Sequence, residues 1–344
     1  MQAVTFQAPG EVRIEEKPDP ELTAGDDAIV RVEASGICGS DLHIFHGRVP
    51  VEPGFTIGHE FVGTVLAVGD DVARVKVGDR VLGCFHTACA TCSSCLRGDY
   101  HRCRSGQTFG HGSKLGDLQG AQAELLLVPR ANLTLRRVPE GMASEVALFA
   151  GDVMGTGYHA IAHAGMRAGD TVAVLGLGPV GLCAVQAALA GGAVTVFAID
   201  TVAERLAMAA SFGATPLHLT EDEPKRAVRS ATEGLGVDVV VDAVGDPGPL
   251  EMAVSLARDA GTVSGIGAYA GRGEVPLGLA WLKGLQLRLG LANVIAHVDR
   301  VLALMEAGKL DPAPLVTHRM PLEQALAAYE LYDQRQALKI VLTP

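Results

Sequence analysis

The feature of the sequence that most limits the fold is a charge-free run, residues 171–199, between Asp170 and Asp200. A run of this length could cross a bilayer as a single helix. Glycines and a proline interrupt it, however, at Gly176, Gly178, Pro179, Gly181, Gly191 and Gly192. They divide it into a β-branched stretch, a turn, an alanine-rich stretch and a second β-branched stretch. This pattern is typical of a parallel β-α-β unit whose strands are buried on both faces, so we expect no membrane span.

The alternation of strands and helices continues downstream of this run. Strands are predicted at 171–175, 194–199, 237–242 and 262–266, with helices at 179–190, 202–212, 221–231 and 249–258. Strands that alternate with helices predict a parallel, doubly wound sheet. Residues 1–140 instead form short β-rich pieces between Pro, Gly and Asp, which predicts a mostly antiparallel, barrel-like domain. Helices near 143–164 (interrupted around 155–157), 293–307 and 322–332, and a strand at 338–342, complete the prediction.

Composition excludes several classes of protein. The 344 residues carry a net charge of −11, which is unlike a protein that binds nucleic-acid phosphates. Hydrophobic residues make up 48% of the chain, so it can bury a large core, and its length predicts two domains. The N-terminal residues lack the basic and apolar regions of a signal peptide, and we therefore expect a cytoplasmic location. The expected partner is a small molecule, with no nucleic acid and no membrane.

A glycine-rich motif lies between the first predicted strand and helix of the parallel region. Its sequence, Gly176-Leu177-Gly178-Pro179-Val180-Gly181, matches the dinucleotide fingerprint G-x-G-x-x-G. The glycines allow a tight turn, a close approach of the pyrophosphate and close helix–strand packing. Asp200 ends the next apolar strand, where a carboxylate can bind the ribose hydroxyls of NAD and repel a 2′-phosphate. The motif predicts NAD as the cofactor.

Four of the seven cysteines are crowded into one short segment, at Cys89, Cys92, Cys95 and Cys103. An odd total and this crowding favour metal binding over disulfides. Four thiolates suit a closed, structural zinc site. An iron–sulfur cluster remains an alternative, because cysteine spacing alone does not exclude it.

A second set of metal-binding residue types lies near the N-terminus. Cys38 precedes Gly39-Ser40-Asp41-Leu42-His43, and His59 belongs to the segment Gly58-His59-Glu60-x-x-Gly63-x5-Gly69-x-x-Val72. Cys38 and His59 each occur in a glycine-flanked turn beside other polar residues. Two or three protein ligands and one open position would form a catalytic zinc site.

These three motifs, in this order, resemble the zinc-dependent medium-chain alcohol dehydrogenases over essentially the whole chain. The resemblance implies an α/β fold, in which a Rossmann domain with a doubly wound parallel sheet is inserted into a mostly antiparallel, barrel-like (GroES-like) catalytic domain. Residues 1–152 and 292–344 would form the catalytic zinc domain, and residues 153–291 the NAD-binding domain. The resemblance also implies two Zn²⁺ per chain and a homo-oligomer, expected to be a tetramer, with a dimer as the alternative.

The resemblance also assigns roles to individual residues. It places Cys38, His59 and Asp152 as ligands of the catalytic zinc, with Glu60 behind the metal or able to enter its shell. Asp41 would orient the ligand histidine, Ser40 and His43 would relay a proton, and Phe85 would line the substrate pocket. Further cofactor contacts would come from Arg205, Val244, Ile266, Gly267, Leu289, Gly290 and Lys339. His46 and His111 could line the substrate cleft, although a surface or packed role is more common for such residues.

The implied activity is hydride transfer between a primary or secondary alcohol and NAD, which gives an aldehyde or ketone. A polyol or amino-alcohol dehydrogenase, similar to sorbitol or threonine dehydrogenases, is the alternative. A zinc-free quinone or enone reductase would not need the zinc residues. A non-catalytic NAD-binding protein would need neither the zinc ligands nor Ser40 and His43. The sequence does not identify the substrate.

Overall fold

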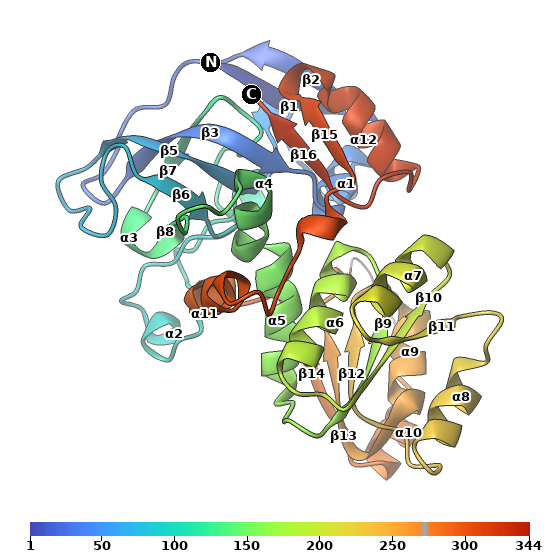
Figure 1. Ribbon diagram of the computed structural model, residues 1–344. Coiled ribbons are helices and arrows are strands. Elements are labelled where there is room, and N and C mark those ends of the chain that lie inside the picture. The colour runs from blue at the N-terminus through green and yellow to red at the C-terminus, as the bar shows by residue number, and fades with distance from the viewer. Residues whose placement is uncertain (270–273) are drawn as a thin grey trace. The chain divides into compact units, whose positions relative to one another are not determined.

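The computed structural model describes residues 1–269 and 274–344, which divide into two compact units (Figure 1). Unit 1 comprises Met1–Gly155, Asn293–Glu306 and Asp311–Pro344, and unit 2 comprises Thr156–Ala292 and Ala307–Leu310. Because the chain begins and ends in unit 1, unit 2 is the inserted one. Residues 307–310, which we assigned to the zinc domain, group with unit 2.

Unit 2 is built on a six-stranded parallel sheet of order β11-β10-β9-β12-β13-β14. This is the order 3-2-1-4-5-6 of a Rossmann domain, so the predicted fold class is confirmed. The strands are β9 (Thr171–Leu175), β10 (Thr195–Asp200), β11 (Thr215–His218), β12 (Val237–Asp242), β13 (Ala257–Gly265) and β14 (Gln286–Leu289). The helices are α5 (Val153–Ala164, which begins in unit 1), α6 (Pro179–Ala190), α7 (Ala203–Ser211), α8 (Pro224–Ala231), α9 (Pro247–Leu256) and α10 (Leu277–Leu282).

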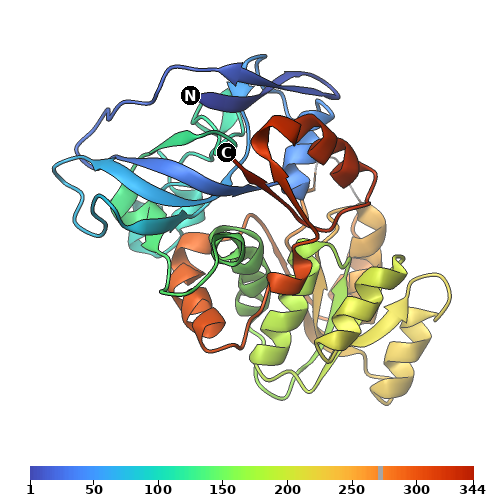
Figure 2. The ribbon, with the colours of Figure 1, turned by 45° about the horizontal axis from the view of Figure 1, so that its top comes forward.

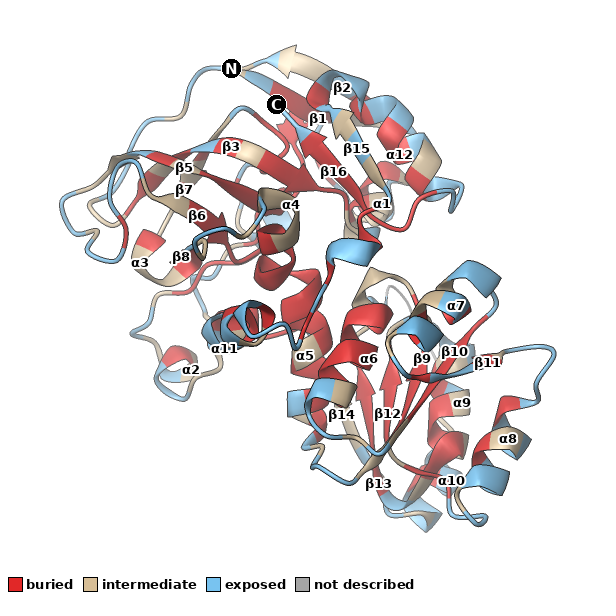
Figure 3. Ribbon diagram, viewed as in Figure 1, coloured by how far each residue is buried: buried red, intermediate tan, exposed pale blue. Residues whose placement is uncertain are grey.

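The charge-free run forms the centre of unit 2. It supplies β9, α6 and most of β10, and Figure 3 shows buried residues along β9 and β12 and over much of α6. Strands at the centre of a parallel sheet are covered on both faces, which explains why no charge occurs in this run. Among the described residues, no helix combines the length and the apolar character needed to cross a membrane.

Unit 1 contains a seven-stranded sheet of order β15-β16-β3-β5-β6-β8, with β7 also paired to β3, and a three-stranded sheet β2-β1-β4. All its pairings are antiparallel except β15 with β16. The strands are β1 (Gln2–Ala8), β2 (Glu11–Glu16), β3 (Ala28–Gly36), β4 (Phe55–Thr56), β5 (Glu60–Val68), β6 (Arg80–Gly83), β7 (Leu125–Val128), β8 (Leu135–Arg137), β15 (His318–Pro321) and β16 (Ile340–Thr343). The helices are α1 (Gly39–Phe45), α2 (Ser93–Leu96), α3 (Ala131–Thr134), α4 (Ser144–Ala147), α11 (Val294–Glu306) and α12 (Ala325–Asp333).

The C-terminal segment completes unit 1. Val341 of β16 pairs with Gly36 of β3, and Figure 2 shows this red segment beside the blue strands of the N-terminal part. Two hydrophobic cores of unit 1 can be described among the residues that the structure covers. One gathers side chains of β1, α1, α12 and β16 around Tyr329, and the other fills the barrel around Phe61 and Phe109, whose ring centroids lie 5.4 Å apart.

The predicted helix over 143–164 is interrupted at a different place from the one we expected. The chain forms α4, a 3-10 turn at Leu148–Gly151, and then α5, and the break falls at Asp152, whose φ of −146° and ψ of −90° are not helical. The expected break around 155–157 is therefore wrong. A Cβ on Gly157 would lie 2.6 Å from the backbone nitrogen of Ala184, so this glycine permits close packing against α6.

Other boundaries also differ from the prediction. The helix expected over 221–231 begins only at Pro224, and the helix expected over 249–258 spans Pro247–Leu256. Both begin at a proline, whose fixed φ favours the first helical turn. Strand β13 begins at Ala257 rather than at residue 262.

Candidate zinc and dinucleotide sites

Three segments of unit 1 bring together one potential metal-binding cluster. Cys38 follows β3 and caps α1, His59 and Glu60 lie where β5 begins, and Asp152 occupies the bend before α5. One ligand atom from each of these four residues lies within 4.8 Å of all the others. The sequence therefore identified residues that the fold gathers in one place.

Hydrogen bonds fix the His59 ring within this cluster. Its Nδ1 lies 3.1 Å from Asp41 Oδ1, and the other Asp41 oxygen accepts the Cys38 N–H at 2.9 Å. Since the Asp41 carboxylate accepts a hydrogen bond, Nδ1 carries the proton and Nε2 of the neutral ring keeps its lone pair, as a metal ligand requires. This Nε2 faces Asp152 Oδ2 at 3.1 Å and Ser40 Oγ at 3.4 Å.

The charges around His59 fit a divalent cation. Burial opposes the charged ring, but the carboxylates of Asp41 and Asp152 raise the pKa of His59 well above its ordinary value. Burial likewise opposes ionisation of Asp152, but its interaction with His59 lowers the pKa of Asp152. Zinc–ligand bonds of about 2.0–2.3 Å place tetrahedral ligands about 3.3–3.8 Å apart. His59 Nε2 and Asp152 Oδ2 are 3.1 Å apart, and all four candidate ligand atoms lie within 4.8 Å of one another. A thiolate, an imidazole and a carboxylate at this spacing fit a catalytic zinc.

Glu60, a member of the cluster, forms a buried ion pair with Lys339, and the exposed fraction of each is 0%. The Lys339 ammonium donates to Glu60 Oε1 and, at 3.1 Å, to the carbonyl of Ile37. Burial raises the pKa of Glu60 to about 7 although Lys339 opposes this shift. Glu60 Oε2 is buried and has no hydrogen-bond partner among the described residues. Glu60 is therefore held by Lys339 with one oxygen left for a metal.

The predicted contact of Lys339 with the cofactor pyrophosphate is wrong. Its side chain has no exposed surface, and its ammonium also lies 5.6 Å from the centre of the Phe149 ring. A group outside the protein cannot reach it.

The predicted proton relay and pocket residue are arranged around the same cluster. Ser40 and His43 are three residues apart on α1, so they share one face of that helix. The Phe85 ring is nearly perpendicular to His59, with 6.3 Å between the centroids. These positions are compatible with the expected roles of all three residues.

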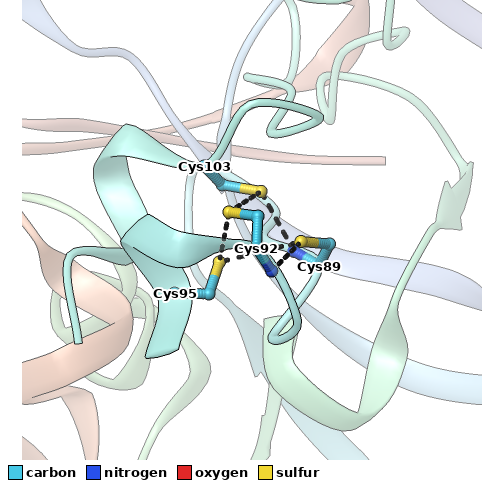
Figure 4. Close-up of side chains that lie close together, drawn as sticks. All are labelled: Cys89, Cys92, Cys95 and Cys103. Carbon is cyan, nitrogen blue, oxygen red and sulfur yellow. Dashed lines mark hydrogen bonds between the residues drawn. The ribbon is translucent and has the colours of Figure 1, made fainter. Parts of the chain in front are cut away.

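The four cysteines converge in a loop of unit 1 (Figure 4). Sγ of Cys95 lies 3.6 Å from Sγ of Cys92 and 3.9 Å from Sγ of Cys89, and Sγ of Cys103 lies 4.0 Å from that of Cys92. These distances are too long for disulfides and match the edges of a tetrahedral zinc–thiolate site. Hydrogen bonds from Thr91 and from backbone N–H groups lower the pKa of Cys89 to about 5, which favours the thiolate.

Asn293 is a residue that sequence analysis missed. Its Nδ2 donates to the carbonyl of Gly98 at 2.7 Å and so ties the cysteine loop to the start of α11. In the sequence Asn293 precedes an apolar helix and resembles an ordinary helix cap. No local pattern could connect it with a loop 195 residues away.

The glycine-rich turn of unit 2 forms an open cradle at the start of α6. Gly176 has a φ of +81°, and a Cβ on Gly181 would lie 1.8 Å from the Gly176 carbonyl oxygen. A Cβ on Gly178, which caps α6, would meet no atom within 4 Å. Pro179 and Val180 then begin the helix, whose N-terminal N–H groups favour a phosphate. The turn fits the pyrophosphate of a dinucleotide.

Asp200 is fixed against this turn. Its Oδ2 accepts the Leu177 N–H at 2.6 Å, its Oδ1 accepts those of Thr201 and Val202 at 2.7 and 2.9 Å, and Arg205 lies 3.9 Å from Oδ2. The other expected cofactor residues lie at or just beyond the carboxyl ends of β12, β13 and β14, where Rossmann domains bind ligands: Val244, Ile266, Gly267, Leu289 and Gly290.

Two alanine substitutions distinguish an effect on dinucleotide binding from an effect on folding. We expect Gly178→Ala to preserve the melting temperature within about 2 °C, because its φ of −63° suits alanine and the space is open. The added methyl group should nevertheless weaken dinucleotide binding at least about 10-fold. Gly181→Ala should instead destabilise unit 2, because its Cβ would overlap a backbone carbonyl. Thermal unfolding measures the stability of both variants, and calorimetric titration measures their affinity for NADH. Unchanged NADH affinity in Gly178→Ala would contradict the cradle.

Comparisons with known proteins agree with this geometry. Residues 24–140 match the alcohol dehydrogenase GroES-like domain and residues 179–306 the zinc-binding dehydrogenase family. A probable zinc-binding alcohol dehydrogenase of Mycobacterium tuberculosis is 39% identical over 100% of this chain and 89% of its own length. The structure of an alcohol dehydrogenase from Thermus sp. ATN1 is 46% identical, with a TM-score of 0.96 over 100% of this chain and 99% of that one.

Two further solved structures contain nicotinamide cofactors. An alcohol dehydrogenase of Escherichia coli CFT073, complexed with NADH, is 28% identical, with a TM-score of 0.90 over 100% of this chain and 99% of that one. A putative zinc-binding dehydrogenase of Sinorhizobium meliloti 1021, bound to NADP, is also 28% identical, with a TM-score of 0.88 and the same coverage.

The chain belongs to the zinc-binding alcohol dehydrogenases of the medium-chain dehydrogenase/reductase superfamily. It is a zinc-dependent oxidoreductase that acts on alcohols, and its two clusters fit one structural and one catalytic zinc.

Proposed function

We propose that this protein oxidises a small primary or secondary alcohol to the aldehyde or ketone with NAD⁺, and catalyses the reverse reaction. The observation that carries the proposal is the Cys38–His59–Asp152 cluster, with Ser40 Oγ 3.4 Å from His59 Nε2. In a closed zinc site, all ligands of the metal come from the protein. Here the Ser40 hydroxyl lies next to the ligand atoms, where it can form a hydrogen bond with a substrate oxygen. The cysteine loop, in contrast, provides only four sulfurs and has a structural role.

Each residue of the cluster then has a defined task. Cys38, His59 and Asp152 hold the metal, Asp41 keeps the proton on Nδ1 of His59, and Glu60 offers its unpaired Oε2. Zinc, when bound, supplies a Lewis acid that polarises the substrate oxygen.

The side chains of α1 carry the substrate proton. Ser40 takes up the proton of the substrate hydroxyl as its own hydroxyl proton leaves, and His43, one turn later, passes the released proton towards solvent. A histidine suits this task because its pKa lies near physiological pH.

A panel of alcohols, aldehydes and ketones with NAD⁺, NADP⁺ and their reduced forms tests the proposal on zinc-loaded protein. We expect NADH formation with at least one simple primary or secondary alcohol. No turnover of any alcohol or carbonyl compound by protein that binds NADH and contains zinc would contradict it.

We predict that NAD⁺ is preferred to NADP⁺ by at least about 100-fold in kcat/KM, a difference of about 2.7 kcal/mol. Asp200 is held at the end of β10 by three backbone N–H groups, so its carboxylate cannot turn away easily from a 2′-phosphate. Like charges about 4 Å apart cost about 4 kcal/mol at an effective dielectric constant near 20. Steady-state kinetics with both cofactors measure the ratio.

Asp200→Ser should reduce this preference, chiefly by weakening the use of NAD⁺. Glu204→Ser on the neighbouring α7 is the matched control and should leave the ratio unchanged. Equal efficiency of the unmodified protein with both cofactors would show that Asp200 does not face the ribose.

We also propose that the chain forms a homo-oligomer, expected to be a tetramer. In the described part of the chain, β14 pairs only with β13 and ends the sheet. Exposed apolar side chains lie on β14 and on the preceding α10, with exposed fractions of 69% at Leu277, 83% at Trp281 and 74% at Leu282. An open sheet edge beside an apolar patch is a common site of association.

The single tryptophan makes this proposal measurable. We expect light scattering to give about four times 35.7 kDa, and Trp281 to fluoresce as a buried side chain that shifts to the red on dissociation. Trp281→Glu should give a smaller species. A mass near 35.7 kDa at working concentration would refute the oligomer.

A further inference from the structure

His111 lies directly beside the zinc cluster, although the function proposed above assigns it no task. It belongs to the segment between β6 and β7 and is 8% exposed. Its ring centroid lies 5.0 Å from that of His59, with 65° between the two planes. The Phe85 ring also lies near that of His59, with 6.3 Å between the centroids.

Backbone packing fixes the position of His111 relative to His59. Gly110 has a φ of +66°, and a Cβ on it would lie 2.4 Å from the carbonyl oxygen of Gly58. The two glycines immediately before His111 and His59 therefore touch through their backbones. The Gly110 N–H also donates to the carbonyl of Leu118 at 2.9 Å. Both histidines are thus carried on one rigid pair of turns.

A hydrogen bond determines which nitrogen of His111 is an acceptor. Nδ1 lies 2.9 Å from the carbonyl oxygen of Phe109, which can only accept, so Nδ1 carries the proton. Nε2 of the neutral ring is then an acceptor, and it has no hydrogen-bond partner in the described part of the chain. His111 keeps a small exposed surface.

We infer that His111 determines substrate specificity by accepting, through Nε2, a hydrogen bond from a second donor on the carbon next to the reacting carbinol. The inference rests on the proposed function, because it needs the reacting oxygen at the Cys38–His59–Asp152 cluster. The ring of His111 lies close to this cluster, with its centre 5.0 Å from that of His59, so a substituent on the adjacent carbon is the part of the substrate expected to meet it. The donor is a hydroxyl or an amine. A simple alkanol leaves Nε2 without this partner, so it should be the poorer substrate.

The test compares 2-butanol, 2,3-butanediol and 3-amino-2-butanol on the zinc-loaded enzyme with NAD⁺. We expect kcat/KM to be about 10-fold higher for the diol or the amino alcohol than for 2-butanol. The compound that shows the increase identifies the donor, a hydroxyl for the diol or an amine for the amino alcohol. His111→Phe keeps a planar ring without the acceptor and should abolish this preference, while 2-butanol changes by less than about 3-fold. His111→Gln, which restores an acceptor oxygen, should recover part of it.

A matched control and a binding measurement complete the test. His318→Phe replaces a histidine of β15 whose ring contacts Thr317, and it should retain the preference. Calorimetric affinities of 2-butanol and 2,3-butanediol for the zinc- and NADH-loaded protein should show the same difference and the same loss in His111→Phe. Equal kcat/KM and equal affinity for all three alcohols would overturn the inference. An equal loss of kcat/KM for all three alcohols in both His111 variants would also overturn it. Absence of turnover with a retained difference in affinity would instead refute the proposed function.

Discussion

Replacement of His59 by alanine is expected to lower kcat/KM for any alcohol substrate at least about 1,000-fold, which corresponds to about 4 kcal/mol. The imidazole connects Asp41, Asp152 and Ser40 through its two nitrogens, so its removal breaks the arrangement that holds the catalytic metal. NADH affinity should change by less than about 3-fold, because the glycine-rich turn and Asp200 belong to unit 2.

Steady-state kinetics, calorimetry with NADH and metal analysis of the same preparation measure these effects together. His318→Ala, at a half-buried position of β15, is the control and should retain activity and zinc. Retention of more than a tenth of the activity by His59→Ala with its zinc content unchanged would show that His59 is not a ligand.

Replacement of Cys89 by serine should lower the free energy of unfolding by more than about 4 kcal/mol, as expected for loss of a structural metal. This is the largest loss of stability that we expect for any substitution named here. The cysteine loop has little hydrophobic core of its own, since only Cys95 of its four cysteines is buried. Thermal unfolding should shift to lower temperature, and the zinc content should fall by one ion per chain. The fraction that remains folded should keep its catalytic zinc.

Ser93→Ala is the matched control for this variant. Ser93 is exposed and lies next to Cys92 at the start of α2, so the change should alter stability by less than about 0.5 kcal/mol. An unchanged melting temperature and zinc content in Cys89→Ser would contradict a structural metal in this loop.

Features that depend on short-range pattern were predictable from the sequence. The parallel sheet follows from the buried strands of the charge-free run, because only strands covered on both faces can dispense with polar residues. The glycine-rich turn and the four cysteines were also evident, since each places its functional groups within about one turn or loop of the chain. Cys38 and His59 were found because each lies in a distinctive glycine-flanked turn.

Several features that depend on contacts between distant segments were missed, whereas the meeting of Cys38, His59 and Asp152 was expected only through the family resemblance. The break at Asp152 was expected three residues later, because the glycines there resemble helix breakers, whereas Gly157 in fact serves close helix packing. Lys339 was assigned to the cofactor, but the fold places it against Glu60, 279 residues away in the chain. The contact of Asn293 with Gly98 is equally remote. A lysine or asparagine alone does not indicate which distant carboxylate or carbonyl it will meet.

The metal content of the active protein tests the central claim most directly, which is that two separate ligand sets hold two different zinc ions. Elemental analysis of fully loaded, active protein should give about two zinc ions per chain and no iron. Mild chelation should remove one ion together with the activity, while the second remains until the protein unfolds. At most one zinc per chain in fully active protein, or iron in place of zinc at the four cysteines, would contradict the account.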